Sequence, residues 1–355
     1  MRLLVTGGAG FIGSAVVRRC VGEGWHVTNL DALTYAGDPR TVESAANAPS
    51  YSFVHADICD AEAVARAFQT AQPDAVIHLA AESHVDRSID GPAEFLRTNI
   101  DGTACMLEAA LTWYRTLEGA AKQAFRFVHV STDEVYGDLR PNDPAFKETT
   151  PYAPNSPYAA SKASADHLAR AWNRTYGLPV IITNCSNNYG AFQHPEKLIP
   201  TVIRKALSGQ PVPIYGTGEN VRDWLYVEDH VTGLLKALER GHPGEKYNFG
   251  GGAEITNIEM ARRLCALLDE KRPRADGASY AEQITFVTDR PGHDFRYAVA
   301  SDKAWAALVW KPEYGPEEGL SKTVDWYLAH ADWLIRDEAE LQRLGLGDAA
   351  PAAAV

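Results

Sequence analysis

The feature that most constrains the fold is the segment LLVTGGAGFIGS at residues 3–14, where a short apolar run leads directly into a glycine-rich turn. Gly7, Gly10 and Gly13 have the spacing of a turn that joins a strand to a helix and lets the backbone approach a pyrophosphate. A glycine motif alone is weak evidence. Here Asp31 ends the next strand-like run, where a carboxylate suits the ribose hydroxyls of NAD and repels the extra phosphate of NADP. A loop aspartate that only caps a helix is the less favoured interpretation.

The rest of the chain alternates in the way this motif requires. Strand-like runs at 2–6, 26–30, 51–55, 74–79, 125–130 and 178–183 alternate with helical patterns at 12–23, 61–71, 92–117 and 157–176. This alternation predicts an α/β fold with a Rossmann-type doubly wound parallel sheet. We expect an NAD-binding domain over 1–187, to which the chain returns around 223–250. A smaller, partly discontinuous C-terminal substrate-binding domain should cover 188–335, followed by a flexible tail over 336–355.

Composition limits the classes of partner. The apolar fraction of 45% and the charged fraction of 23% are those of an ordinary soluble globular protein. A net charge of −12 argues against a nucleic-acid or anionic-membrane partner, although it allows a local phosphate site. The five cysteines are widely spaced and form no CxxC pair, which argues against a disulfide framework or a zinc site. We therefore expect a cytoplasmic protein with no metal and no membrane span.

Two short motifs carry candidate chemistry. In VSTDEVYG, Asp133 and Glu134 follow an apolar run, where carboxylates are costly to desolvate unless they are used. In PYAASK, Tyr158 and Lys162 lie on one helix face at i, i+4, and a nearby cation is what a phenol needs to act as a base near neutral pH. A solvated turn for the acids and an ordinary amphipathic helix for the tyrosine and lysine are the plain alternatives.

Taken together, GGxGxxG, the Ser/Thr-rich strand end and YxxxK resemble the extended short-chain dehydrogenase/reductase superfamily. The segments HLAAESHVDRSI, STDEVYGDL, NCSNNYG, RDWLYVEDH and DRPGHDFRYA are similar to those of one of its families, the dTDP-glucose 4,6-dehydratases. The resemblance covers nearly the whole chain. It implies a lyase that removes water from dTDP-glucose with tightly bound NAD, and a homodimer formed through a four-helix bundle.

The resemblance also implies a division of labour. Tyr158 with Lys162 would be the base for oxidation of C4, and Thr132 would orient the C4 oxygen. Glu134 would take the proton at C5, and Asp133 would donate one to the departing C6 hydroxyl. For that duty the pKa of Asp133 must lie well above about 4, and both burial and Glu134 act in that direction.

Further contacts follow from the motifs and the resemblance. For the cofactor we expect Gly7, Gly10, Phe11, Ile12, Gly13, Asp31, Ala32, Leu33, Thr34, Asp57, Ile58, Leu79, Ala80, Ala81, Ser83, Thr98, Tyr158, Lys162 and Asn188. For the nucleotide sugar we expect Ser83, Thr132, Asn187, Lys197, Leu198, Pro213, Ile214, Tyr215, Arg222, Asn257, Asp289, Arg290, Pro291, Gly292 and His293. The cations in the second set would bind a diphosphate.

Three other functions stay open at this point. They are a 4,6-dehydratase that acts on another nucleotide sugar, a 4-epimerase of the same superfamily, and a non-catalytic NAD-sensing protein on the same fold. Epimerases lack the pair of acids at Asp133 and Glu134, and sensing proteins usually lose the tyrosine and lysine. The sequence therefore favours the dehydratase.

Overall fold

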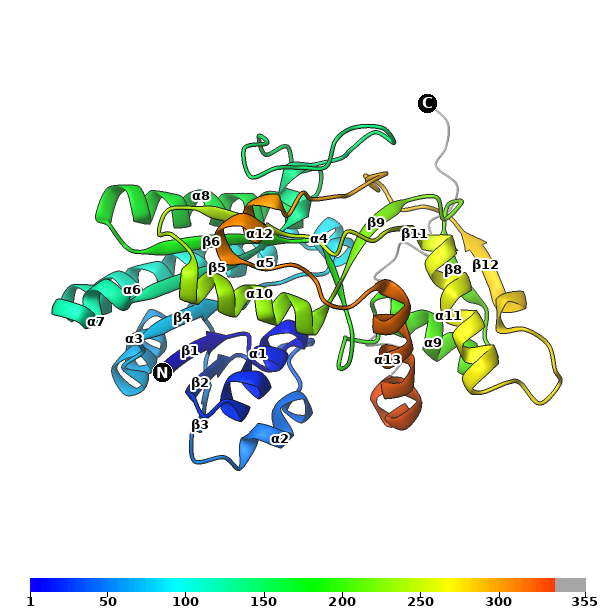
Figure 1. Cartoon of the computed structure of the whole chain (residues 1–355), viewed down its shortest axis with the longest axis horizontal. Coiled ribbons are helices and arrows are strands. Elements are labelled where there is room, and N and C mark those ends of the chain that lie inside the picture. Colours follow the sequence, from blue (N-terminus) through cyan, green and yellow to red (C-terminus); the bar gives the residue numbers. More distant parts are fainter. Residues whose placement is uncertain (336–355) are drawn as a thin grey trace.

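A seven-stranded parallel sheet occupies the N-terminal part of this computed structural model, which describes residues 1–335 (Figure 1). Its strands lie in the order β10-β6-β5-β4-β1-β2-β3, and every neighbouring pair is parallel. The strands are β1 (Arg2–Thr6), β2 (His26–Asp31), β3 (Tyr51–His55), β4 (Ala75–His78), β5 (Arg126–Thr132), β6 (Val180–Cys185) and β10 (Lys246–Phe249). The order reverses between β1 and β4, which is the position where ligands bind in doubly wound sheets.

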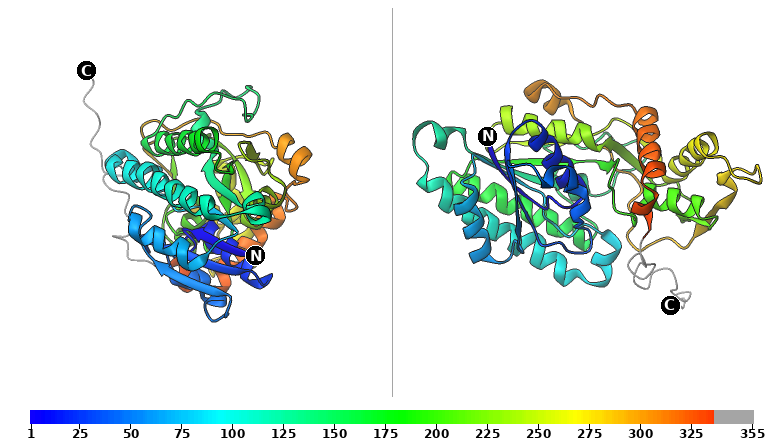
Figure 2. Two further views of the ribbon diagram at one scale, coloured as in Figure 1. Left: turned by 90° about the vertical axis from the view of Figure 1, so that its left-hand side faces the viewer. Right: turned by 90° about the horizontal axis from the view of Figure 1, so that it is seen from below.

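Helices cover both faces of this sheet (Figure 2). One face carries α1 (Phe11–Gly22), α10 (Val227–Arg240) and α12 (Asp302–Leu308), and the other carries α3 (Ala61–Ala71), α6 (Thr103–Thr116) and α8 (Pro157–Tyr176). Because both faces are covered, β4 and β6 are buried along their whole length, and each begins with an apolar run of three residues. The predicted Rossmann-type fold is confirmed.

The second part of the molecule is built around a separate apolar core. It contains a three-stranded sheet of β7 (Asn187–Tyr189), β9 (Val221–Tyr226) and β11 (Glu254–Thr256), and a two-stranded sheet of β8 (Val212–Tyr215) and β12 (Ile284–Val287). The helices α9 (Leu198–Leu207), α11 (Asn257–Lys271) and α13 (Pro316–Ala329) pack on one another beside these strands (Figure 1). Between β9 and β11 the chain returns to the large sheet as α10 and β10.

Short elements complete the described chain. They are η1 (Pro39–Val42), α2 (Glu43–Ala46), α4 (Val85–Asp90), α7 (Gly119–Ala124), η3 (Asp133–Tyr136), η4 (Tyr280–Gln283) and η5 (Ala331–Leu334). Among residues 1–335 no helix has the length and apolar character needed to cross a bilayer. The tail predicted over 336–355 lies outside the described residues.

The helix predicted over 92–117 is interrupted. It consists of α5 (Pro92–Leu96), a π-helical turn (Arg97–Gly102) and α6. The wider turn aims the Asn99 side chain at the sheet edge, where its amide accepts from Glu82 N at 2.9 Å and donates to Ser161 Oγ at 2.8 Å. Helical periodicity cannot reveal a turn of this kind, because π-turns replace ordinary helix at sites that need such a contact.

The Tyr158–Lys162 motif lies on α8, and strong local signals fix both ends of that helix. The Ser156 hydroxyl accepts from Ala159 N at 3.1 Å, and Pro157 occupies the first turn. At the other end Gly177 ends the helix with φ +72°, a left-handed conformation that glycine adopts readily. The beginning of α8 is therefore fixed directly beside the end of β5, with which it is in contact.

The glycine turn yields a test of the fold. In Gly7→Ala the new Cβ would lie 2.8 Å from the Ala80 backbone, and φ is +70°, so strain and a clash add together. Gly24→Ala is the matched control, with φ +81° and open space around the new Cβ. We expect the control to lose roughly 1–2 kcal/mol of unfolding free energy, the typical cost of a left-handed non-glycine residue. Chemical denaturation of Gly7→Ala should show a clearly larger loss, and equal losses would contradict the close approach of β1 and β4.

Candidate functional site

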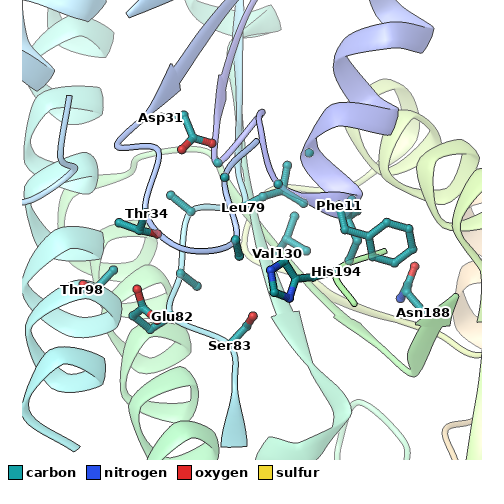
Figure 3. Close-up of a pocket in the computed structure, with 18 of the residues that line it drawn as sticks. Phe11, Asp31, Thr34, Leu79, Glu82, Ser83, Thr98, Val130, Asn188 and His194 are labelled. Atoms are coloured by element: carbon teal, nitrogen blue, oxygen red, sulfur yellow. The ribbon is translucent and has the colours of Figure 1, made fainter. Parts of the chain in front are cut away.

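A cavity of about 640 Å³ opens at the carboxyl edge of the large sheet, where β1, β2, β4 and β5 end (Figure 3). Almost all of the side chains predicted for the cofactor line it. They are Gly7, Gly10, Phe11, Ile12, Gly13, Asp31, Ala32, Thr34, Asp57, Ile58, Leu79, Ala80, Ala81, Ser83, Thr98, Tyr158, Lys162 and Asn188. Leu33 is the exception: it does not line the cavity, and its backbone N–H donates to Asp31 Oδ1 at 2.8 Å.

The glycine turn has the shape required for an anion. A Cβ on Gly13 would lie 2.1 Å from Gly7 O, so only glycine allows α1 to start this close to β1. Within the described residues, no side chain caps the start of α1 at Gly10. The N–H groups of its first turn therefore face the cavity edge unshielded, and they suit a pyrophosphate.

Asp31 is fixed by backbone donors. Ala9 N donates to Oδ2 and Leu33 N to Oδ1, both at 2.8 Å. Burial raises the pKa of Asp31 above its ordinary value, and these two hydrogen bonds oppose the shift. Each carboxylate oxygen keeps acceptor capacity for a further donor, which fits the two hydroxyls of a ribose.

Asp57 lies at the end of the cavity beyond Asp31. It accepts from Cys59 N at 2.8 Å and from Arg97 Nη2 at 2.6 Å. Burial favours the neutral acid, but these bonds and the Arg97 charge hold the pKa of Asp57 below its usual value. Asp57 is therefore an ionised acceptor with a fixed orientation.

The hydroxyl and the two acids of the STDE segment lie together where β5 becomes η3. The Thr132 hydroxyl accepts from Glu134 N at 3.2 Å and is 3.3 Å from Asp133 Oδ1. Asp133 is 2% exposed, and its Oδ2 has no hydrogen-bond partner among the described residues. Burial, and then the charges of Glu134 and Asp223, raise the pKa of Asp133 well above its ordinary value. These surroundings favour the protonated form of Asp133, which is the form that can donate a proton.

Glu134 has a different electrostatic environment. Burial raises its pKa, but Arg290, Arg222 and Lys197 all favour its ionised form. Two adjacent carboxyl groups in different surroundings can take opposite roles, one as acid and one as base.

Tyr158 and Lys162 line the same cavity from α8. Lys162 Nζ donates to Val130 O on β5 at 2.9 Å, which fixes the ammonium beneath the strand end. Burial, and then the charge of Glu134, raise the pKa of Tyr158 well above its ordinary value. The phenol is therefore neutral in the protein alone, and it needs added positive charge beside it to become a base.

The residues predicted for the nucleotide sugar separate into two groups. Ser83, Thr132, Asn187 and Lys197 line the cavity. The others are outside its lining, and they are Leu198, Pro213, Ile214, Tyr215, Arg222, Asn257, Asp289, Arg290, Pro291, Gly292 and His293. The side chain of Ile214 is 1% exposed within the apolar core, so only its backbone can meet a ligand.

Part of the second group converges on one carboxylate. Arg290 Nη1 donates to Asp86 Oδ1 at 2.7 Å, and the Tyr215 hydroxyl donates to Asp86 Oδ2 at 3.2 Å. Arg222 packs with its guanidinium 4.4 Å from the centre of the Tyr297 ring. Both arginines favour the ionised form of Glu134, which links this group to the cavity.

Glu196 is a cavity residue that sequence reasoning missed. It is nearly buried, with His84 Nε2 at 3.5 Å, His194 Nδ1 at 3.7 Å and Arg87 Nη2 at 3.9 Å from its Oε2. Lys197, which was predicted, is its neighbour in the segment PEK. That adjacency was the available signal, but the two histidines approach Glu196 only through the fold.

A second contact that was missed joins the glycine turn to the C-terminal part. Trp333 of η5 donates from its indole to Gln193 O at 3.1 Å, and the Arg40 guanidinium lies 4.8 Å from the centre of one of its rings. Arg40 belongs to η1, where Thr41 Oγ1 donates to Ala9 O in the glycine turn at 3.0 Å. Arg40 and Trp333 line both the cavity and a neighbouring hollow of about 410 Å³, so the pair forms a wall between them. We call this contact the Arg40–Trp333 pair.

Comparison with known proteins decides the family. The family model described as GDP-mannose 4,6 dehydratase matches residues 4–323. The chain belongs to this family. It is 56% identical to dTDP-glucose 4,6-dehydratase 1 of Escherichia coli K12 over 343 residues, which cover 94% of each chain, and 53% identical to the Neisseria meningitidis enzyme over 352 residues, with 98% and 99% covered. The resemblance predicted from the sequence is confirmed.

Solved structures give the same result. DesIV, a dTDP-glucose 4,6-dehydratase from Streptomyces venezuelae solved with NAD bound, has a TM-score of 0.85 and 44% identity, covering 94% of this chain and 98% of its own. UDP-glucose 4-epimerase from Thermotoga maritima has a TM-score of 0.82 and 30% identity, covering 93% and 100%. The scaffold is therefore shared between dehydratases and epimerases, and the side chains of the site must distinguish them.

Proposed function

We propose that the chain is an NAD-dependent dTDP-glucose 4,6-dehydratase that converts dTDP-glucose to dTDP-4-keto-6-deoxyglucose and water. The observation that carries this proposal is the pairing of a buried Asp133, whose protonated form is favoured, with a Glu134 whose ionised form three cations favour, beside Tyr158 and Lys162 in one cavity. Tyrosine and lysine alone support oxidation and reduction. The added acid and base supply what the removal of water requires.

NAD would be held by the groups that line the cavity. The glycine turn and the start of α1 would bind its pyrophosphate, and Asp31 the hydroxyls of a ribose. Bound there, NAD would supply the hydride chemistry, in which a hydride leaves C4 of the sugar for the cofactor and later returns to C6 while C5 regains a proton. Because the cofactor ends as it began, the chain must retain it through the cycle.

The first proton transfer falls to α8. Tyr158 would take the C4 hydroxyl proton while Thr132 orients the C4 oxygen. Since burial and Glu134 hold this phenol neutral, the positive charge of Lys162 is needed to make its deprotonation favourable. Lys162 therefore acts by charge, and its bond to Val130 O fixes its position.

The elimination falls to η3. Once C4 is a ketone, the C5 proton becomes acidic, and Glu134 would remove it. Asp133 would protonate the C6 hydroxyl as it leaves as water. Both acids lie at the start of one short turn after β5, and Glu134 lines the cavity beside Asp133.

Cations at the cavity wall and just beyond it suit the diphosphate of the nucleotide. Lys197 Nζ donates to Ser83 O at 3.2 Å, which places this cation at the cavity wall. Arg222 and Arg290 are mostly buried, and a buried arginine suits the bidentate recognition of a phosphate. We propose that these three residues bind the diphosphate, and that 188–335 forms the nucleotide-sugar domain.

We propose a homodimer formed through a four-helix bundle of α6 and α8 from each copy. The support is the superfamily resemblance and the packing of these two helices against each other outside the sheet. We also propose a cytoplasmic location, which the five free thiols of the described chain support.

A panel of nucleotide sugars tests the assignment. Incubation with dTDP-, UDP-, CDP- and GDP-glucose should give the 4-keto-6-deoxy product fastest from the dTDP sugar, with no net NAD turnover. Product mass and the absorbance of the 4-ketosugar in base are the readouts. A product epimerised only at C4 would overturn the dehydratase assignment, and intact substrate in the presence of NAD would favour a sensing protein.

Glu134→Gln should separate the half-reactions. The amide cannot accept a proton, so exchange of the C5 proton with deuterated solvent should fall by roughly 10²–10⁴-fold, while C4 oxidation continues. Reduced-nicotinamide absorbance and mass spectrometry measure the two steps. Glu62→Gln, at an exposed glutamate of α3 outside the cavity lining, is the control and should leave exchange unchanged. Normal C5 exchange in Glu134→Gln would refute this base.

The pH dependence of elimination should report Asp133. An acid must be protonated to donate, and its raised pKa keeps it protonated where an ordinary aspartic acid, with a pKa of about 3.9, is ionised. Elimination should fall at low pH, where the base Glu134 is protonated, and should decline again as pH rises through the pKa of Asp133. Asp133→Asn should slow elimination more than oxidation and lose this decline. An identical profile in both proteins would contradict the role.

Because the Arg40–Trp333 pair lines the cavity, we expect it to help retain the cofactor. Trp333→Ala removes both the ring under Arg40 and the bond to Gln193, so purified protein should carry less NAD and release it several-fold faster. Trp333→Phe keeps an aromatic face and should be intermediate. Trp305→Ala, at an exposed tryptophan, is the control. Bound NAD measured after gel filtration distinguishes them, and full occupancy in Trp333→Ala would contradict the prediction.

A further inference from the structure

A buried carboxylate lies beneath the site without a part in the chemistry above. Asp166 is on α8, one helical turn after Lys162, and is 2% exposed. It is outside the cavity lining, so it touches neither sugar nor cofactor. A charge enclosed in this way is costly, and its presence calls for a partner or a use.

Three donors hold this carboxylate in its ionised form. His129 Nε2 on β5 is 3.1 Å from Oδ1, while the Tyr152 hydroxyl at 2.7 Å and Asn184 Nδ2 at 3.2 Å donate to Oδ2. Burial by itself would raise the pKa of Asp166, but these partners and the Lys162 charge hold it below its ordinary value. The donors come from three separate segments, so the position of the carboxylate is rigidly defined.

The ammonium of Lys162 needs such a neighbour. It is 5% exposed, and its one hydrogen bond among the described residues goes to the neutral carbonyl of Val130. Burial lowers the pKa of Lys162, Asp166 gives the larger opposing contribution, and the Cys185 thiol gives a smaller one.

Within residues 1–335, the other titratable groups beside Lys162 are neutral or cationic. His78 and His129 lie on the same side of the sheet, and burial lowers the pKa of each, so both are neutral. Tyr158 and the Cys185 thiol are neutral as well, because burial raises their pKa. Two further groups lie near Asp166. Burial raises the pKa of Tyr136, so this phenol is neutral, and Lys246 is a half-buried lysine, so neither residue adds negative charge.

We propose that Asp166 is a positioning residue of the reaction, a fixed buried counter-charge that keeps Lys162 an ammonium. The proposal rests on the proposed roles of Tyr158 and Lys162. A cationic nicotinamide beside Lys162 would favour loss of the lysine proton, and a neutral lysine cannot stabilise the phenolate. Asp166 offsets that repulsion from below, one turn from the lysine and two turns from the tyrosine.

Asp166→Asn tests the charge at nearly constant shape. Its amide can re-pair with His129, Tyr152 and Asn184, whose donor and acceptor roles can reverse. Without the negative charge the ammonium is less stable, so Lys162 loses its proton at lower pH. The alkaline limb of the pH profile for C4 oxidation should move down by about one unit, a tenfold change in the equilibrium. In Asp166→Glu the negative charge is kept, so the alkaline limb should lie at the pH that it has in the unaltered protein.

Tyr152→Phe is the matched control, because it removes one donor and keeps the charge. Its alkaline limb should stay where the unaltered protein has it. A lower rate with an unmoved limb in Asp166→Asn would show that Asp166 only supports the structure, and it would overturn the proposal.

Lysine Cε-labelled NMR gives a readout that does not depend on activity. The Lys162 signal, assigned by its absence in Lys162→Arg, should titrate at lower pH in Asp166→Asn than in the unaltered protein. If Asp166→Asn does not fold, the unaltered protein still decides: a Lys162 that is already neutral at pH ~7 would refute the counter-charge. If dTDP-glucose is not a substrate, the proposed function fails, while this titration still tests Asp166.

Discussion

The parallel pairing of seven strands is the constraint on which the site depends. Parallel strands end at a common edge, so the loops that follow β1, β2, β4, β5 and β6 meet there although they are far apart in sequence. Both faces of the sheet are covered by helices, so this edge is also where polar side chains can reach a cavity without disturbing the core. The C-terminal part lies beside the sheet (Figure 1). Its residues Lys197, Arg222 and Arg290 favour the ionised form of Glu134.

Burial shapes the chemistry at this edge more than any single contact does. It raises the pKa of Asp133, Glu134 and Tyr158 and lowers that of Lys162, which favours the neutral form of every group. Fixed charges oppose this effect for selected groups: three cations favour the ionised form of Glu134, and Asp166 favours that of Lys162. The acid and the base thus differ through their neighbours and not through their residue type.

The sequence predicts what depends on neighbouring residues. The glycine turn, Asp31 and the tyrosine–lysine pair are local patterns, so the sheet and most of the cofactor wall followed from them. Contacts between distant segments were not predictable: His129 meets Asp166 across 37 positions, and Arg290 meets Asp86 across 204. Such pairs leave no periodicity in a single chain. The π-turn at Arg97–Gly102 was not predicted for a related reason, because the hydrogen bonds of its Asn99 go to Glu82 and Ser161, which are distant in sequence.

The late strand β10 has a consequence for synthesis on the ribosome. It pairs with β6, yet it is made more than sixty residues later, after β7, α9, β8 and β9. Until it emerges, the nascent sheet carries an unpaired edge at β6 and an uncovered face where α10 will pack. The two parts must therefore fold together. A chain that ends after residue 187 would keep its motifs, but it would expose the unpaired edge of β6 and an apolar face of the sheet, and we expect it to aggregate.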